Sequence, residues 1–463
     1  ANLKEVILLL RQHNVQPLKH LVRSVDSKSK LVALYEGIAN NMFVSDEDAV
    51  MALYGVEIEN STYRKLKSDL QEKLLDLVLS INIDLEHYSD YQKAYYEAHK
   101  QWATIRFLIG QNANTAALTL ASRLMRQAEK FDFTLLSMDI ASYLRVQYGL
   151  RESNDKRFME ANRQFKIYQK IYNAECLAEE LYTTLVVNMV NSRSPNGNMH
   201  LLATEYYAQV ADEMALYKTY KLQMYGYMIG LVHHNFESNY QKTLKLCEEA
   251  IQFFKSRPYE PRVPLQIFYY QQLLAHIHLQ QYEEAKQSVK HCIALIQEGT
   301  FNWFKFNELH LILMLHVQKY EKAEKLLIKA LDHARFEFLP DNAKELWRIY
   351  ESYINYLILL GKVEKSSNNR FKLGKFINEV PIFSKDKGGL NIAILIIKFL
   401  YLLNERKYNK VIDEIEAIEQ YCYRHLRGKN TQRSYIFIKM LLQIPACEFS
   451  AEKVELKTQQ NLE

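Results

Sequence analysis

The chain has 463 residues, which is enough for about three domains or for one long array of repeats. Lys and Arg number 59 against 54 Asp and Glu, and the resulting net charge of +5 excludes a histone-like polycation and a disordered acidic tail. Only 13 Gly and 8 Pro are present, which disfavours an all-β fold because its many turns use both residues.

The first 90 residues are predicted to form a small helical module. Helical patterns of apolar residues cover residues 3–13, 29–40, 46–54 and 62–83. Ser45 and Ser61 stand where a hydroxyl can cap the first turn of a helix. We favour a cap or docking module, because a stack of repeats needs a terminal unit that covers its first apolar face.

The same module has a second interpretation, which is DNA binding. A short helix, a turn through Gly55 and a longer helix form a helix-turn-helix pattern, and the longer helix is weakly similar to the reading helix of winged-helix transcription regulators. Its candidate DNA contacts are Tyr63, Arg64, Lys65 and Lys67. Residues 1–90 carry ten basic and fourteen acidic side chains, however, and this balance opposes phosphate binding.

Residues 91–445 are predicted to form a second, entirely helical domain, followed by a tail at 446–463. Within residues 282–297, for example, Tyr282, Ala285, Val289 and Cys292 recur at spacings of three and four, which places them on one face of a helix. Segments rich in Pro, Gly and Asn separate such patterns. The sequence therefore predicts an all-α fold.

A short phrase recurs along this second domain: an aromatic residue, two polar residues, a small residue, and a second small or apolar residue seven positions later. The copies are Tyr240 with Thr243 and Ala250, Tyr282 with Ala285 and Cys292, Tyr320 with Ala323 and Ala330, and more weakly Tyr408 with Val411 and Ile418. Their spacing is about 40 residues where copies are adjacent, and Val363 begins a degenerate copy. Small residues let the two helices of a hairpin approach, and each hairpin leaves an apolar face for the next one to cover.

This phrase resembles the second helix of a tetratricopeptide repeat (TPR), although the unit is longer than the usual 34 residues. The resemblance implies a superhelical solenoid of antiparallel helix hairpins, whose first helices line a concave groove that holds a peptide or a partner helix. Carried over by register, the groove-facing positions are Tyr270, His278, Glu308 and His316. A lone histidine on such a face has a simpler interpretation as a packed or solvated side chain.

The carboxyl-terminal quarter is basic. Residues 361–463 hold eighteen basic and twelve acidic side chains, and residues 421–440 hold no acid. The cations that we single out are Arg424, Arg427, Lys429 and Arg433, and tyrosines precede and follow them at 421, 423 and 435. Such a patch suits an anionic partner such as RNA, but solvated cations at a corner between helices give the same pattern.

Signatures of catalysis are missing from the sequence. It contains no phosphate-binding glycine loop, no His-Glu-x-x-His pair and no Gly-x-Ser-x-Gly elbow. His233 and His234 are adjacent and so point about 100° apart on a helix, which does not suit a metal without distant partners. We expect no enzymatic activity, no cofactor and no metal site.

The five cysteines form no close pair, and we see neither a signal peptide nor a membrane span, so we expect a cytoplasmic protein. The function that this sequence favours is a scaffold or adaptor for a protein or peptide partner, and a homo-oligomer is compatible with it. One alternative is a regulator that resembles the bacterial peptide-responsive regulators, which join a helix-turn-helix to TPRs. The other is RNA binding through the basic quarter.

Overall fold

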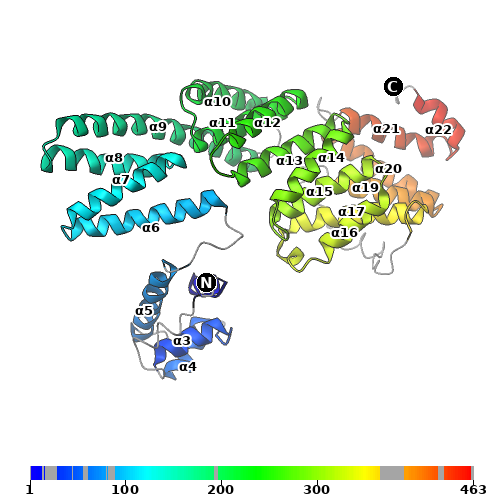
Figure 1. The fold of residues 1–463 in the computed structure, drawn as a ribbon. Coiled ribbons are helices and arrows are strands. Elements are labelled where there is room, and N and C mark those ends of the chain that lie inside the picture. The colour runs from blue at the N-terminus through cyan, green and yellow to red at the C-terminus, as the bar shows by residue number, and fades with distance from the viewer. Residues whose placement is uncertain are drawn as a thin grey trace. The chain divides into compact units, whose positions relative to one another are not determined.

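The computed structural model describes residues 2–12, 15, 29–43, 45–55, 61–79, 81, 89–191, 197–364, 390–425 and 432–459. Every regular element in these residues is helical, which confirms the predicted all-α class (Figure 1). Among the same residues, no helix is both long enough and apolar enough to cross a membrane. Contacts divide the chain into two compact units, Ala1–Tyr168 and Gln169–Glu463, which are described separately below.

The first unit begins with the predicted small helical module. Its helices are α1 (Asn2–Gln12), α3 (Lys30–Ala39), α4 (Asp46–Tyr54) and α5 (Ser61–Val78), and they share one hydrophobic core. Ser45 caps α4 in a reciprocal capping box with Asp48, as its sequence predicted. Gly55 ends the same helix in the left-handed conformation, with φ at 69°.

The rest of the first unit contains longer helices, namely α6 (Asp90–Gly110), α7 (Asn114–Lys130), α8 (Thr134–Val146), a π turn at Gln147–Arg151 and the start of α9 (Asp155–Asn191). Helix α6 packs on α7, and α7 packs on α8. The boundary that we predicted at residue 90 falls at the start of α6, whereas the boundary between the compact units falls inside α9.

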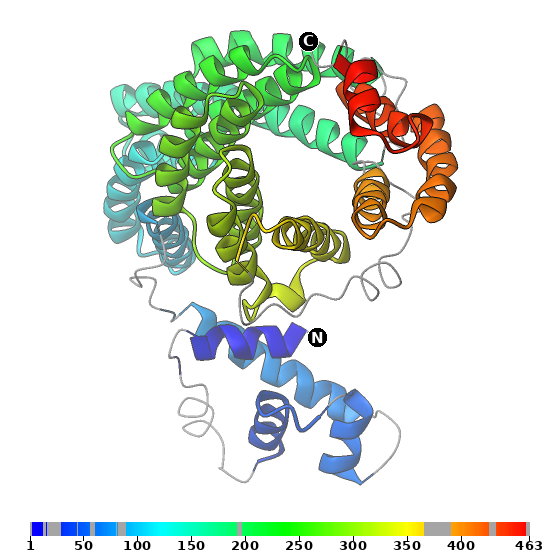
Figure 2. The same cartoon turned by 90° about the vertical axis from the view of Figure 1, so that its right-hand side faces the viewer.

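In the second unit, most helices pack against the next helix of the chain, as the contacts and Figures 1 and 2 show. The helices are α10 (Gly197–Leu216), α11 (Tyr220–Phe236), α12 (Tyr240–Lys255), α13 (Arg262–His278), α14 (Tyr282–Leu295), α15 (Phe301–His316), α16 (Tyr320–Leu331), α17 (Asp341–Leu359), α19 (Leu390–Asn404), α20 (Tyr408–His425), α21 (Gln432–Ala446) and α22 (Ala451–Thr458). Helix α22 lies in the segment that we predicted as a tail, and it packs on α21.

The turns that precede the four repeat phrases share one backbone geometry. Ser238, Gln280, Gln318 and Arg406 all have φ between 52° and 59°, and in each case the tyrosine that opens the phrase follows two residues later. At the second of these turns, the Gln281 N–H donates to the His276 carbonyl at 2.9 Å. The equivalent bond closes each of the other turns at 2.8 to 3.0 Å. This is the Schellman ending of a helix, which satisfies carbonyls that the helix leaves open.

The same turn also occurs before the degenerate phrase, at Gly361. Its φ is 69°, and the Lys362 N–H donates to the Leu357 carbonyl at 2.9 Å. The degenerate phrase that starts at Val363 therefore follows the same turn as the clear copies. Residues 365–389, which include the rest of that phrase, lie outside the described residues.

The small or apolar residues of the phrase are buried in all four copies. Thr243, Ala285, Ala323 and Val411 are at most 1% exposed, and so are the partners seven residues later, Ala250, Cys292, Ala330 and Ile418. Such burial is what close packing of neighbouring helices requires.

The hydrophobic cores of the second unit follow one another along the chain. One core joins residues 174–229, the next residues 231–354, and another residues 392–438. Each core is thus built mainly by helices that are neighbours in sequence, as in proteins that stack one supersecondary unit on the next.

Candidate functional site

The predicted groove positions Tyr270 and Glu308 lie close together, and a third side chain joins them. The Tyr350 hydroxyl of α17 donates to Glu308 Oε1 of α15 at 3.5 Å. Burial and the nearby Glu308 charge raise the pKa of both Tyr270 and Tyr350. These three residues, one from each of α13, α15 and α17, are called the inter-helix row below.

Glu308 is the only acid of the inter-helix row, and it is held from two sides. Its side chain is 13% exposed, and Lys305, one turn earlier in α15, lies 2.6 Å from Glu308 Oε2. The other carboxylate oxygen faces Tyr350. A fixed, largely buried carboxylate near two tyrosines can accept hydrogen bonds from a ligand backbone or a cationic side chain. Sequence register found Tyr270 and Glu308, but it did not place Tyr350.

The other two predicted groove residues lie at helix ends, stacked on tyrosines. His278, the last residue of α13, stacks on Tyr240 with ring centroids 4.1 Å apart and planes within 5°. His316, the last residue of α15, stacks on Tyr282 with centroids 5.7 Å apart. Both histidines are exposed. The two stacks are equivalent. In each one, the tyrosine that opens a repeat phrase contacts the last residue of the helix that follows.

Tyr63 and Lys67, which are candidate DNA contacts in α5, bond to a side chain inside the amino-terminal module. Tyr63 is 1% exposed and its hydroxyl donates to Asp46 Oδ1 of α4 at 2.8 Å. Lys67 Nζ lies 2.5 Å from Asp46 Oδ2, and this hydrogen bond is the main reason that the pKa of Asp46 is lowered. Arg64 and Lys65 remain exposed.

The basic quarter is described only in part. Arg427 and Lys429 lie outside the described residues. For Arg424 in α20 and Arg433 in α21, only the helical backbone is described.

A surface cavity of about 570 Å³ lies in the first unit, where α7, α8 and α9 meet next to the π turn. Its lining includes the basic side chains of Arg126, Lys156 and Arg157 and the carboxylates of Glu129 and Glu160. Because both signs of charge line it, the cavity does not select one class of charged ligand.

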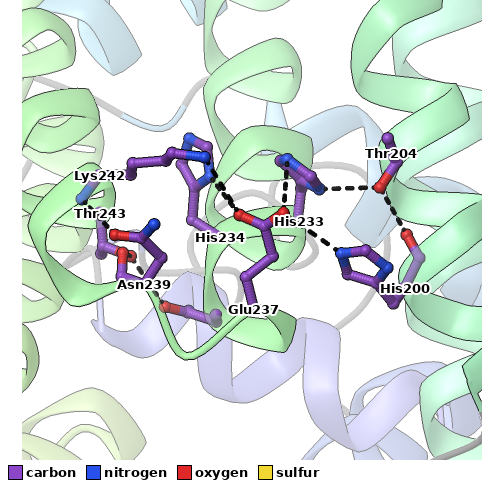
Figure 3. A network of polar contacts seen from close by, with 9 residues as sticks. His200, Thr204, His233, His234, Glu237, Asn239, Lys242 and Thr243 are labelled. Atoms are coloured by element: carbon purple, nitrogen blue, oxygen red, sulfur yellow. Dashed lines mark hydrogen bonds and ion pairs between the residues drawn. The ribbon is translucent and has the colours of Figure 1, made fainter.

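A polar cluster in the described part of the second unit was missed by sequence reasoning. It brings together His200 near the start of α10 and His233, His234 and Glu237 at the end of α11 (Figure 3). Glu237 Oε1 lies 3.4 Å from His200 Nε2 and 3.9 Å from His233 Nε2. Glu237 Oε2 lies 3.8 Å from His234 Nδ1 and 3.5 Å from Lys242 Nζ. We call His200, His233 and Glu237 the histidine–glutamate cluster.

Two glycines on α11 allow the close approach that builds this cluster. A Cβ atom on Gly226 would lie 2.2 Å from the Met214 sulfur, and one on Gly230 would lie 2.8 Å from the Tyr207 ring, both on α10. The Tyr207 ring in turn stacks on His233 with centroids 5.8 Å apart. Close contact of α10 and α11 therefore positions His200 opposite His233.

The local part of this cluster had a signal in the sequence. His233 and Glu237 are four residues apart, and such residues are neighbours on one face of a helix. Burial lowers the pKa of His233 and of His234, so both rings are held neutral to lower pH than a free histidine. The distant partner that sequence analysis found lacking is His200, which only the packing of α10 on α11 supplies.

Comparisons with protein-family models, with curated proteins and with solved structures found no match for this chain.

Proposed function

We propose that this protein is a non-enzymatic scaffold of TPR-like helix hairpins that binds a peptide or protein segment along its first helices. The recurrent Schellman turn and the buried small residues support a stack of similar hairpins. In such a stack, equivalent positions of successive first helices form one extended surface. Binding then rests on shape and on side-chain complementarity rather than on a reaction.

The observation that carries this proposal is the inter-helix row. Tyr270, Glu308 and Tyr350 come from the successive first helices α13, α15 and α17. Tyr350 donates a hydrogen bond to Glu308, and the Glu308 charge raises the pKa of Tyr270. Tyrosine offers large contact area with a polar tip, and it loses little conformational entropy when it binds. A carboxylate between two such rings fixes the register of a bound segment.

The proposal is tested by substitutions in the row that preserve shape. A partner is first isolated with the wild-type chain, and its affinity is then measured with both proteins purified. Glu308→Gln is expected to weaken binding by about 1.5–3 kcal/mol, because hydrogen bonds to a charged group contribute that much. Tyr270→Phe is also expected to weaken binding of the partner.

The matched control is Glu283→Gln on the second helix α14, where the carboxylate is 81% exposed and pairs with Lys286 in the same helix. This variant is expected to bind the partner like the wild type. If Glu308→Gln and Tyr270→Phe leave the affinity unchanged while both variants fold normally, the inter-helix row is not the binding surface.

A further inference from the structure

The histidine–glutamate cluster has the composition of a transition-metal site. It offers two imidazole nitrogens and one carboxylate oxygen, and these three atoms lie within 4.8 Å of one another. Two histidines and a glutamate are a known ligand set for zinc. Ligands that are 2.0–2.1 Å from a tetrahedral zinc lie about 3.3 Å apart. The separation of 3.4 Å between His200 Nε2 and Glu237 Oε1 is already close to that value.

A neighbouring hydroxyl orients the His233 ring for this role. Thr204 Oγ1 donates to the His200 backbone carbonyl at 2.9 Å, one turn earlier in α10. Its single proton is then in use, so at 3.1 Å from His233 Nδ1 it accepts the proton of that nitrogen. The lone pair of His233 is thereby placed on Nε2, the atom that faces Glu237. Metal-binding histidines are commonly held in this way by a hydrogen bond on the second nitrogen.

We propose that His200 Nε2, His233 Nε2 and Glu237 Oε1 bind one divalent transition-metal ion of the zinc class. Three protein ligands leave a fourth tetrahedral position for water, and the His200 side chain, 38% exposed, leaves that side of the cluster open to solvent. The ion joins the start of α10 to the end of α11 and so stabilises the packing of these helices. Because it binds the folded site, it raises the stability of the second unit.

The Lys242 ammonium group competes with the metal ion for the Glu237 carboxylate. Its ammonium group lies 3.5 Å from Glu237 Oε2, and the side chain is 57% exposed. Metal binding requires this flexible cation to turn away into solvent, because like charges repel. Removing the ammonium group is therefore expected to strengthen metal binding, which would not follow if Glu237 served only as the partner of Lys242.

The experiment uses the whole 463-residue chain, freed of metal with a chelator and dialysed. Titration with zinc chloride in a calorimeter is expected to show one ion per chain, and cobalt(II) is expected to give the visible absorption of a tetrahedral site. His200→Ala and Glu237→Gln are each expected to abolish this binding. Thr204→Val is expected to weaken it by about 10–100-fold, as the loss of an outer-shell partner does. Lys242→Met is expected to tighten it.

His316→Ala is the matched control, since it removes an exposed histidine at the end of another helix, outside the cluster. It is expected to bind zinc like the wild type, and circular dichroism checks that every variant is folded. The proposal is overturned if the wild type does not bind one zinc ion per chain. It is also overturned if folded His200→Ala and Glu237→Gln proteins bind as the wild type does, since other histidines then hold the metal.

Discussion

At the scale of single residues, His310 is a titratable group that the fold shields from water. It lies half-buried in α15, with its ring centroid 5.7 Å from that of Phe306. Burial, together with the charge of Lys322, lowers its pKa to about 4. A histidine in the unfolded chain has a pKa near 6.5, so between these two values the unfolded state binds the proton and the folded state does not. The free energy of unfolding therefore falls as the pH falls through this window.

We predict that His310→Gln removes much of this pH dependence. Between pH 7 and pH 4.5, the wild type is expected to lose about 2–3 kcal/mol more of its unfolding free energy than the variant. Urea unfolding followed by the fluorescence of Trp303 and Trp347, which lie in the same core as α15, measures the difference. The other histidines are present in both proteins, so their contributions to the pH dependence cancel in the difference. A difference between the two proteins that stays constant with pH would contradict the assignment.

Residues could be predicted from the sequence where their burial depends on spacing within one helix. Residues that depend on contact between two helices could not. The small residues of the repeat phrase, such as Ala285 and Cys292, are fully buried as predicted, because their spacing alone defines the helix face. The cluster around Glu237 was missed, because no local pattern says that His200 stands opposite His233. Its assembly depends on how closely α10 approaches α11.

At the scale of elements, the glycines of α11 are the decisive feature of that approach. Glycine normally weakens a helix by up to about 1 kcal/mol relative to alanine. Gly226 and Gly230 are four residues apart and so share one face, where Met214 and Tyr207 of α10 occupy the space that a Cβ atom would need. These glycines therefore stabilise the packing of α11 on α10, although they weaken the helix itself.

We predict that Gly230→Ala destabilises the second unit, although alanine forms helices better than glycine does. The added Cβ would lie 2.8 Å from the Tyr207 ring and 3.0 Å from Leu246, and relieving such overpacking costs about 1–3 kcal/mol. A net loss of about 1 kcal/mol in unfolding free energy is expected in urea titrations. Gly110→Ala in α6 is the control, since nothing lies within 4 Å of its added Cβ. If both variants gain stability, the approach of α10 to α11 is less tight than described.

Element boundaries could be predicted where the sequence carries a capping or turn signal. The helix predicted at 46–54 is α4 with those bounds, because Ser45 caps its start and Gly55 its end. The shared turn before each phrase could not be predicted, because Gln280, Gln318 and Arg406 are not residues that favour positive φ. The aromatic residue two positions later was the only sign of it.

At the scale of the whole molecule, the serial cores predict that the second unit does not unfold in one step. Cys247 and Cys292 belong to the core of residues 231–354, whereas Cys422 belongs to the later core, and all three thiols are buried. Burial raises the pKa of Cys292 to about 12, so these thiols react only when their core opens. Stability in such stacks is a sum of local terms and of contacts between neighbours.

We expect thiol labelling in moderate urea to modify Cys422 at a rate different from that of Cys247 and Cys292. The measurement uses variants that keep one cysteine each, with mass spectrometry of quenched samples. Cys247 and Cys292, which share a core, are expected to react at similar rates. A single common rate for all three would show that the second unit opens as one cooperative body.

The order of the cores along the chain has a consequence for synthesis in the cell. All the buried residues of the core at 174–229 are in place before residue 231 has been added, and Val232 and Phe236 pack against that core soon afterwards. Because local contacts form quickly and domains fold as they emerge from the ribosome, early hairpins can become compact while later ones are still being translated. Each finished hairpin then offers a surface on which the next one assembles. Little apolar surface therefore stays exposed to solvent until a distant part of the chain is made.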